Sequence, residues 1–276
     1  MADPPQFLKV LKRAEEVRAR YAELTNKSNI LVYGNYGTGK TRLASTCPRP
    51  VWIDSFDPGG STTRALQPLI DAGDIIVENK WERDSWKKPF AFKDWEREMR
   101  LREQEGLFQM LGTYQLDSIT RWADSMMYEI LRLGGDKRGS RQGGTPELQD
   151  YMVQQMTAVD WLGVICGYPC NVLVTGHIGL DKDEVTGKIE TGLLLSGKLS
   201  HKVPMVFDEK WITRVDGDKY TLQTRGDGYY KAETRMGGEL FTTHEPPDVR
   251  ELLKKAGRPF ADRPSFKELA DAHKAD

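Results

Sequence analysis

Apolar side chains recur at helical spacing over the first 27 residues. They follow one another at intervals of three or four positions, with charged residues between them: Phe7, Val10, Ala14, Val17, Tyr21 and Leu24. On an α-helix this spacing places the apolar residues in one stripe, so the pattern predicts an amphipathic helix. Fewer than three heptads are too few for a free coiled coil, which leaves docking on its own domain or on a neighbouring subunit.

Short apolar runs bounded by turn residues predict buried strands after this helix. These strands are expected at residues 30–33, 51–54, 75–77, 112–116 and 171–175. Helical patterns separate them, at residues 42–46, from 92 onward, at 121–133 and at 146–167.

The last third of the chain is expected to contain antiparallel strands. Residues 210–215, 220–224 and 229–235 alternate polar and apolar side chains, and the turns Asp-Gly-Asp and Gly-Asp-Gly separate them. This pattern predicts an antiparallel meander. The last 30 residues read as two short helices. We therefore divide the chain into an N-terminal helix (1–27), a core (28–240) and a C-terminal helical tail (241–276).

Composition limits the class of protein. The 276 residues are 38% hydrophobic and 29% charged with a net charge of −1, which is typical of a globular chain and excludes a general polycation. The longest apolar stretches are far shorter than the roughly 20 residues of a membrane span, and no secretory signal is visible, so we expect a cytoplasmic protein. Cys47, Cys166 and Cys170 form no CxxC pair, which favours reduced packing residues.

A phosphate-binding motif follows the first predicted strand. The sequence Gly-Asn-Tyr-Gly-Thr-Gly-Lys-Thr satisfies GxxxxGK[ST] and lies between a strand and a helical segment. Glycines let backbone N–H groups surround a phosphate, the lysine reaches the β- and γ-phosphates, and the threonine hydroxyl binds Mg²⁺. We therefore predict ATP and Mg²⁺ as cofactors, bound by Gly34, Asn35, Tyr36, Gly37, Thr38, Gly39, Lys40, Thr41 and Arg42.

Such a motif needs a second carboxylate for the magnesium ion, at the end of a neighbouring parallel strand. Asp117 fits this place, although Gln115 makes its strand less apolar than a buried central strand usually is. Asp54 ends a more apolar strand but comes only 14 residues after Lys40. We predict that Thr41 and Asp117 hold the metal, with Asp54 as the alternative.

The order of these motifs resembles the RecA-type ATPase core over residues 28–240. More narrowly it resembles the phage-encoded RecA-like ATPases of the Sak single-strand annealing group, whose members carry an AAA domain. The narrower resemblance depends on Leu-Asp-Ser at 116–118, the Gly-rich loop after it and the Ser-Gly-Lys-Leu-Ser-His-Lys-Val-Pro segment at 196–204. It implies an α/β fold: a RecA-like P-loop NTPase core with a mostly parallel central sheet flanked by helices, the C-terminal meander and the N-terminal helix.

The resemblance also implies roles for individual residues. A carboxylate after the second strand would polarise the attacking water; Asp57 stands there, with Asp54 in reserve, although Phe56 occupies the strictly aligned position, where the family usually has Glu. His177 stands where the family keeps a γ-phosphate sensor, usually Gln. Lys231 and Arg235 match basic positions that reach into the ATP site of a neighbouring subunit; the alternative is that they are ordinary surface cations.

Two loops correspond to the DNA-binding loops of the family. The first, residues 134–146, carries Lys137, Arg138 and Arg141 among five glycines. The second, residues 181–192, reads as a hairpin around Thr186-Gly187 and carries four acids against two lysines, which weighs against phosphate contact. The basic residues that would help there are Lys188, Lys198, His201 and Lys202. Aromatic residues 81–95 could stack on bases, but packing in the core or on a subunit is favoured.

Together these features predict an ATPase that binds single-stranded DNA in homologous recombination and promotes annealing or strand exchange. The expected partners are single-stranded DNA, further copies of the chain in a ring or filament, and a single-strand-binding protein, with no membrane. Two alternatives remain: a helicase loader or nucleotide switch, and a P-loop kinase of a small acceptor.

Overall fold

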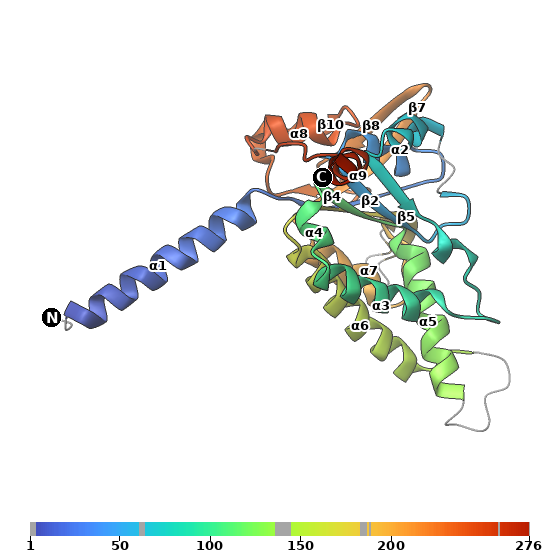
Figure 1. Ribbon diagram of the computed structural model, residues 1–276. Coiled ribbons are helices and arrows are strands. Elements are labelled where there is room, and N and C mark those ends of the chain that lie inside the picture. The colour runs from blue at the N-terminus through green and yellow to red at the C-terminus, as the bar shows by residue number, and fades with distance from the viewer. Residues whose placement is uncertain are drawn as a thin grey trace.

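A central sheet with helices on both faces makes up the body of the computed structural model, and one long helix projects from it (Figure 1). The structure describes residues 4–60, 64–135, 145–182, 187, 189–258 and 260–275. The strands are β1 (Asn29–Gly34), β2 (Val51–Ser55), β3 (Ile75–Glu78), β4 (Thr113–Asp117), β5 (Asn171–Lys182), β6 (Ile189–Leu193), β7 (Glu209–Asp216), β8 (Lys219–Gln223), β9 (Glu233–Thr234) and β10 (His244–Glu245).

The helices follow the same chain order. They are α1 (Pro4–Thr25), α2 (Gln67–Asp71), α3 (Ala91–Gln104), α4 (Leu107–Met110), α5 (Ile119–Gly135), α6 (Leu148–Gly167), α7 (Leu199–Lys202), α8 (Val249–Lys255) and α9 (Phe266–Ala275). Short 3₁₀ segments include η1 (Thr41–Thr46), η4 (Lys80–Arg83) and η5 (Val203–Val206).

The sheet has the order β10-β8-β7-β1-β5-β4-β2-β3, with β6 paired to β5 and β9 to β7. The six strands from β7 to β3 are parallel, whereas β6, β8, β9 and β10 pair antiparallel. The expected α/β fold class, with a mostly parallel central sheet flanked by helices, is confirmed. Because parallel strands share one carboxyl edge, the residues that end β1, β2 and β4 meet there.

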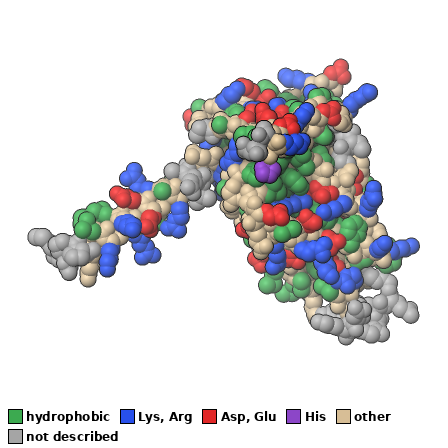
Figure 2. All heavy atoms as spheres, in the orientation of Figure 1, with side chains coloured by type: hydrophobic (Ala, Val, Ile, Leu, Met, Phe, Trp, Pro, Cys, Tyr) green, Lys and Arg blue, Asp and Glu red, His purple; other side chains and the backbone are tan. Residues whose placement is uncertain are grey.

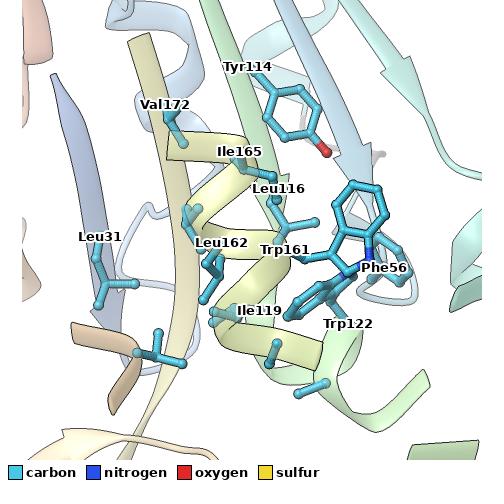
Figure 3. Close-up of a cluster of buried hydrophobic side chains, with 14 of the residues drawn as sticks. Leu31, Phe56, Tyr114, Leu116, Ile119, Trp122, Trp161, Leu162, Ile165 and Val172 are labelled. Carbon is cyan, nitrogen blue, oxygen red and sulfur yellow. The ribbon is translucent and has the colours of Figure 1, made fainter. Parts of the chain in front are cut away.

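Alternate residues of the buried strands face opposite cores. In β1, Leu31 and Tyr33 belong to the cluster beneath α3, α5 and α6, while Ile30 and Val32 belong to the cluster beneath α8. Figure 3 shows Trp161, Leu162 and Ile165 of α6 packed toward the side chains of the sheet in the first cluster. Both faces are therefore covered, which explains the continuous apolar runs of these strands.

The C-terminal strands depart from the predicted meander. β7 and β8 form an antiparallel hairpin, but only two residues of the predicted strand 229–235 are in a strand, and they pair with β7. Asp227 Oδ1 accepts hydrogen bonds from the backbone N–H groups of Tyr229 and Tyr230 (3.0 and 2.8 Å). This local turn competes with strand pairing and replaces the start of the predicted strand.

The segment after the phosphate-binding loop is helical, as predicted, but it is a six-residue 3₁₀ helix. It ends at Thr46, and the next residue, Cys47, is extended and directly precedes Pro48. A proline disfavours helical geometry in the preceding residue, which accounts for the early end of the helix.

The predicted aromatic segment packs in the core. Trp81 and Trp95 are fully buried, whereas Trp86 is exposed. Trp95 packs edge-to-face on Trp122 and Trp161, with ring centroids 5.5 and 5.0 Å apart. Base stacking by Trp81 and Trp95 is therefore wrong as a hypothesis, because neither ring faces solvent.

Gln115 is a buried polar residue in the middle of β4. Its side chain is fully buried, and both its amide nitrogen and its oxygen lack a hydrogen-bond partner among the described residues. Such a group costs about 1–3 kcal/mol, so Gln115 weakens the strand that carries Asp117. Among the described helices, none is long and apolar enough to cross a membrane.

Candidate nucleotide-binding site

The loop of residues 35–40 leaves the carboxyl end of β1 at the centre of the sheet edge. A Cβ on Gly34 would lie 2.2 Å from Thr213 Oγ1, so only glycine fits at this close approach. Gly37 and Gly39 have φ angles of 74° and 87°, in the region that favours glycine. Two of the four fixed motif positions, Gly34 and Gly39, are thus set by backbone geometry.

Lys40 reaches back across this loop. Its Nζ donates to the carbonyl oxygens of Gly34 (3.0 Å) and Asn35 (2.8 Å). Burial lowers the pKa of the ammonium group, and the nearby carboxylates of Asp117 and Asp57 oppose that shift. The cation is therefore held beside the loop where phosphate oxygens would replace the two carbonyls.

Asp117 lies directly beside the motif threonine. Thr41 Oγ1 donates to Asp117 Oδ2 (2.7 Å), and Thr175 Oγ1 of β5 donates to Oδ1. Burial raises the pKa of this carboxyl, and the two threonine hydrogen bonds counteract the shift. A hydroxyl and a carboxylate are the hard oxygen donors that Mg²⁺ prefers, so the pair fits the predicted metal.

Asp57 and His177 form a second pair at the same edge. His177 Nε2 lies 3.0 Å from Asp57 Oδ2, and Ser118 Oγ donates to Asp57 Oδ1 (2.9 Å). The exposed ring of Tyr36 lies over His177, with centroids 4.7 Å apart. His177 Nδ1 is buried and has no hydrogen-bond partner in the described structure. One histidine nitrogen therefore contacts Asp57, and the other is buried.

A cleft of about 870 Å³ opens at this edge; Asp117 does not line it but hydrogen-bonds to Thr41, which does. It includes Tyr36, Lys40, Thr41 and Arg42 from the motif and both members of the Asp57–His177 pair. Among the lining residues that sequence reasoning missed are Arg121, Asp124 and Tyr220. Arg121 and Asp124 could have been found from their place one and two helical turns after Asp117. No sequence signal points to Tyr220. The turn into β8 brings its ring beside the phosphate loop, 3.6 Å from a Cβ built on Gly39.

Asp54 lies outside this cleft, in a fully buried cluster of donors. Its carboxylate accepts from Trp95 Nε1 (2.9 Å), Tyr114 Oη (2.8 Å) and Arg102 (2.9 and 3.0 Å). Trp81 Nε1 also donates, at 3.2 Å. We call these residues the Asp54 cluster. With both oxygens engaged and no exposed surface, Asp54 has neither the access nor the free lone pairs of a metal ligand or a catalytic base.

The predicted trans and DNA residues lie elsewhere. Lys231 pairs with Glu190 (2.9 Å) and Arg235 with Asp208 (3.8 Å), and neither lines the nucleotide cleft of its own chain. Lys198 and Lys202 are exposed at the two ends of the α7 turn. Lys137, Arg138, Arg141 and Lys188 lie outside the described residues.

Comparison with known proteins gives a match to a family model described as AAA domain, over residues 26–236. A KaiC-like protein from the archaeon Pyrococcus horikoshii is similar in structure, with 12% identity and a TM-score of 0.35; the match covers 71% of this chain and 76% of that one. An ATPase from the type III secretion system of pathogenic bacteria has 15% identity and a TM-score of 0.40, over 83% of this chain and 61% of that one. No curated protein matches.

Proposed function

Because the chain belongs to the AAA-domain family, as the match over most of its length shows, we propose that it binds ATP in the cleft at the edge of β1 and hydrolyses it. The observation that carries this proposal is the 2.7 Å contact between Thr41 Oγ1 and Asp117 Oδ2. It joins the last residue of the phosphate motif to a carboxylate at the end of β4, a parallel strand of the same sheet that β5 separates from β1, and so brings together the hydroxyl and the carboxylate that P-loop NTPases need.

Each residue near the cleft then has a distinct task. Thr41 and Asp117 would hold Mg²⁺, which neutralises charge on the phosphate oxygens. Lys40 exchanges its two backbone carbonyls for phosphate oxygens. Asp57 takes a proton from the attacking water, and hydrogen bonds from Ser118 and His177 hold its carboxylate in place.

The test is nucleotide binding by Lys40→Ala, measured by calorimetry with an ATP analogue. Removing the Lys40 cation, which donates to the loop carbonyls, should abolish most of the affinity. Lys254→Ala, an exposed lysine on α8, is the matched control and should bind as the native chain does. Equal binding by both variants would refute the assignment.

The finer proposal is a role in recombination on single-stranded DNA, as a RecA-like protein of the phage Sak type. It is supported by the resemblance of the motifs and by the three cations Lys137, Arg138 and Arg141 in one glycine-rich loop. Neutralising all three should weaken binding and lower the slope of log K against log salt by about 0.7 per lost contact. Nucleotide binding should be unchanged.

An ATPase assay with and without single-stranded DNA distinguishes the alternatives. Stimulation by DNA supports the recombination function. ATP hydrolysis that DNA does not change points to a loader or switch, and phosphate transfer to a small acceptor would identify a kinase. In the recombination function, copies of the chain assemble, and Lys231 and Arg235 reach the ATP of a neighbouring copy.

A further inference from the structure

Helix α1 presents an apolar stripe to solvent. The helix has 22 residues and extends away from the body (Figure 1), and every side chain from residue 6 to residue 21 is exposed. Figure 2 shows hydrophobic side chains among charged ones along this helix. Six of them share one face: Phe7, Val10, Leu11, Ala14, Val17 and Tyr21. Tyr21, the last of them, has 68% of its surface exposed.

The outer face of α6 is also apolar. Trp161, Leu162 and Ile165 cover the core side of this helix, yet its opposite side carries exposed apolar residues as well. They are Leu148, Met152, Val153, Met156 and Val164, and Gly163 and Gly167 continue the same face. Asp160 is the one charged residue on it, and α6 has no lysine or arginine at all. Exposed apolar residues gathered on one face of a helix mark an interaction surface.

The two faces match in length and charge. At about 1.5 Å per residue, α1 spans about 33 Å and the 20-residue α6 about 30 Å. α1 carries five basic and three acidic residues, whereas the two charges of α6 are both acidic. Phe7 and Tyr21 can each bury about 150–250 Å², so the two together supply roughly half of the ~800 Å² per partner of a stable interface.

The two helices of one chain are held apart at their shared end. Lys27 Nζ donates to the carbonyl oxygens of Cys166 (2.6 Å) and Tyr168 (2.5 Å), where α6 ends. The N–H of Ser28 is bound by Asn171 Oδ1 (3.0 Å). For α1 to lie along its own α6, the chain would have to reverse between Thr25 and Lys27, which leaves Asn26 alone to make the turn.

We propose that α1 of one copy packs lengthwise on the outer face of α6 of a second copy. Each copy then offers one helix and one receiving face on different parts of its surface. Such head-to-tail contacts close into a ring or continue as a filament. The proposal rests on the proposed assembly of copies but not on ATP or DNA, so its test contains neither.

The first test joins two differently tagged full-length chains with a bifunctional maleimide. One carries Ala14→Cys, at the middle of the α1 stripe, and the other Met156→Cys, at the middle of the α6 face; central positions serve either helix direction. A band containing both chains is expected. In the control, Ala19→Cys, on the opposite side of α1, replaces Ala14→Cys and should give no such band. The native chain, which carries its own cysteines alone, should give no such band either.

Two other outcomes would overturn the proposal. A band from Met156→Cys alone would show that α6 pairs with α6. A third sample is a chain that carries both Ala14→Cys and Met156→Cys. If it cross-links only within itself, α1 folds back on its own α6.

The second test measures self-association by sedimentation without nucleotide. Val17→Asp places a charge in the stripe and should weaken association by about tenfold or more, because the charge would lose its water without gaining a partner. Ala19→Asp adds the same charge on the other side of α1 and should associate as the native chain does. Equal dissociation constants for the two variants would refute the proposal, while nucleotide binding by Val17→Asp reports separately on the cleft.

Discussion

Arg102 is the charged donor of the Asp54 cluster, and we predict that Arg102→Met is among the most destabilising single substitutions in the chain. Arg102 and Asp54 are both buried, with Arg102 Nη1 2.9 Å from Asp54 Oδ2. Removing one partner of a buried ion pair costs about 3–5 kcal/mol, because the other charge stays buried without compensation. Trp81, Trp95 and Tyr114 still donate to Asp54, so the lower end, about 3 kcal/mol, is expected.

Urea denaturation followed by far-ultraviolet circular dichroism measures this cost. Arg100→Met is the matched control, since Arg100 lies on the same helix but is exposed and pairs with Glu96 at the surface (2.9 Å). It should cost about 1 kcal/mol or less. The double variant Asp54→Asn/Arg102→Met should be more stable than Arg102→Met alone, because the uncompensated charge is gone. If Arg102→Met costs no more than Arg100→Met, the carboxylate is not held as described.

Three further predictions concern the same sheet edge. Burial raises the pKa of Asp117, so the folded protein keeps this proton to a higher pH than the unfolded chain, and its contribution to stability falls as pH rises through the two pKa values. Asp117→Asn should therefore unfold at a higher temperature than the native chain at neutral pH, and the difference between the two unfolding temperatures should shrink in acid. The same variant should lose ATP hydrolysis. An equal difference in unfolding temperature at every pH would contradict burial of the charge as the cause. Gln115→Met should stabilise the protein by about 1–3 kcal/mol in urea denaturation, since it removes two buried polar atoms that lack partners. Asp57→Asn should lower kcat with little change in nucleotide affinity, and a loss of affinity instead would show that Asp57 binds rather than activates.

Local patterns were sufficient for most of the fold. The five predicted strands exist, and β1, β2 and β5 are the short apolar runs buried on both faces that the pattern describes, whereas β3 is a half-buried edge strand and β4 carries Gln115. The strand expected at 229–235 failed because alternation describes side chains only. It does not reveal that the Asp227 carboxylate accepts hydrogen bonds from the backbone N–H groups of Tyr229 and Tyr230, which keeps the start of this segment out of a strand.

The phosphate loop is similarly local, whereas the rest of the cleft is not. Gly34 to Thr41 lie together in sequence, so spacing alone identifies them. Asp57 and His177 are separated by 120 positions, and only the folded sheet, in which β4 lies between β2 and β5, brings their side chains within 3.0 Å. The resemblance to a family pointed to both residues, but nothing in the sequence indicates that they would contact each other.

Asp54 and Asp57 lie close together in sequence, but Asp54 is a buried structural residue and Asp57 lies in the cleft. Asp54 is still within β2, where the buried face is lined by indole, phenol and guanidinium donors from η4, α3 and β4. Those donors fix the end of β2 beside β4, where Ser55 is in register with Asp117. Asp57 comes two residues after the strand, so it leaves the buried face and reaches Ser118 and His177 in the cleft. The buried carboxylate thus determines where the accessible one stands, and weakening the Asp54 cluster should disturb the cleft even though no residue of that cluster lines it.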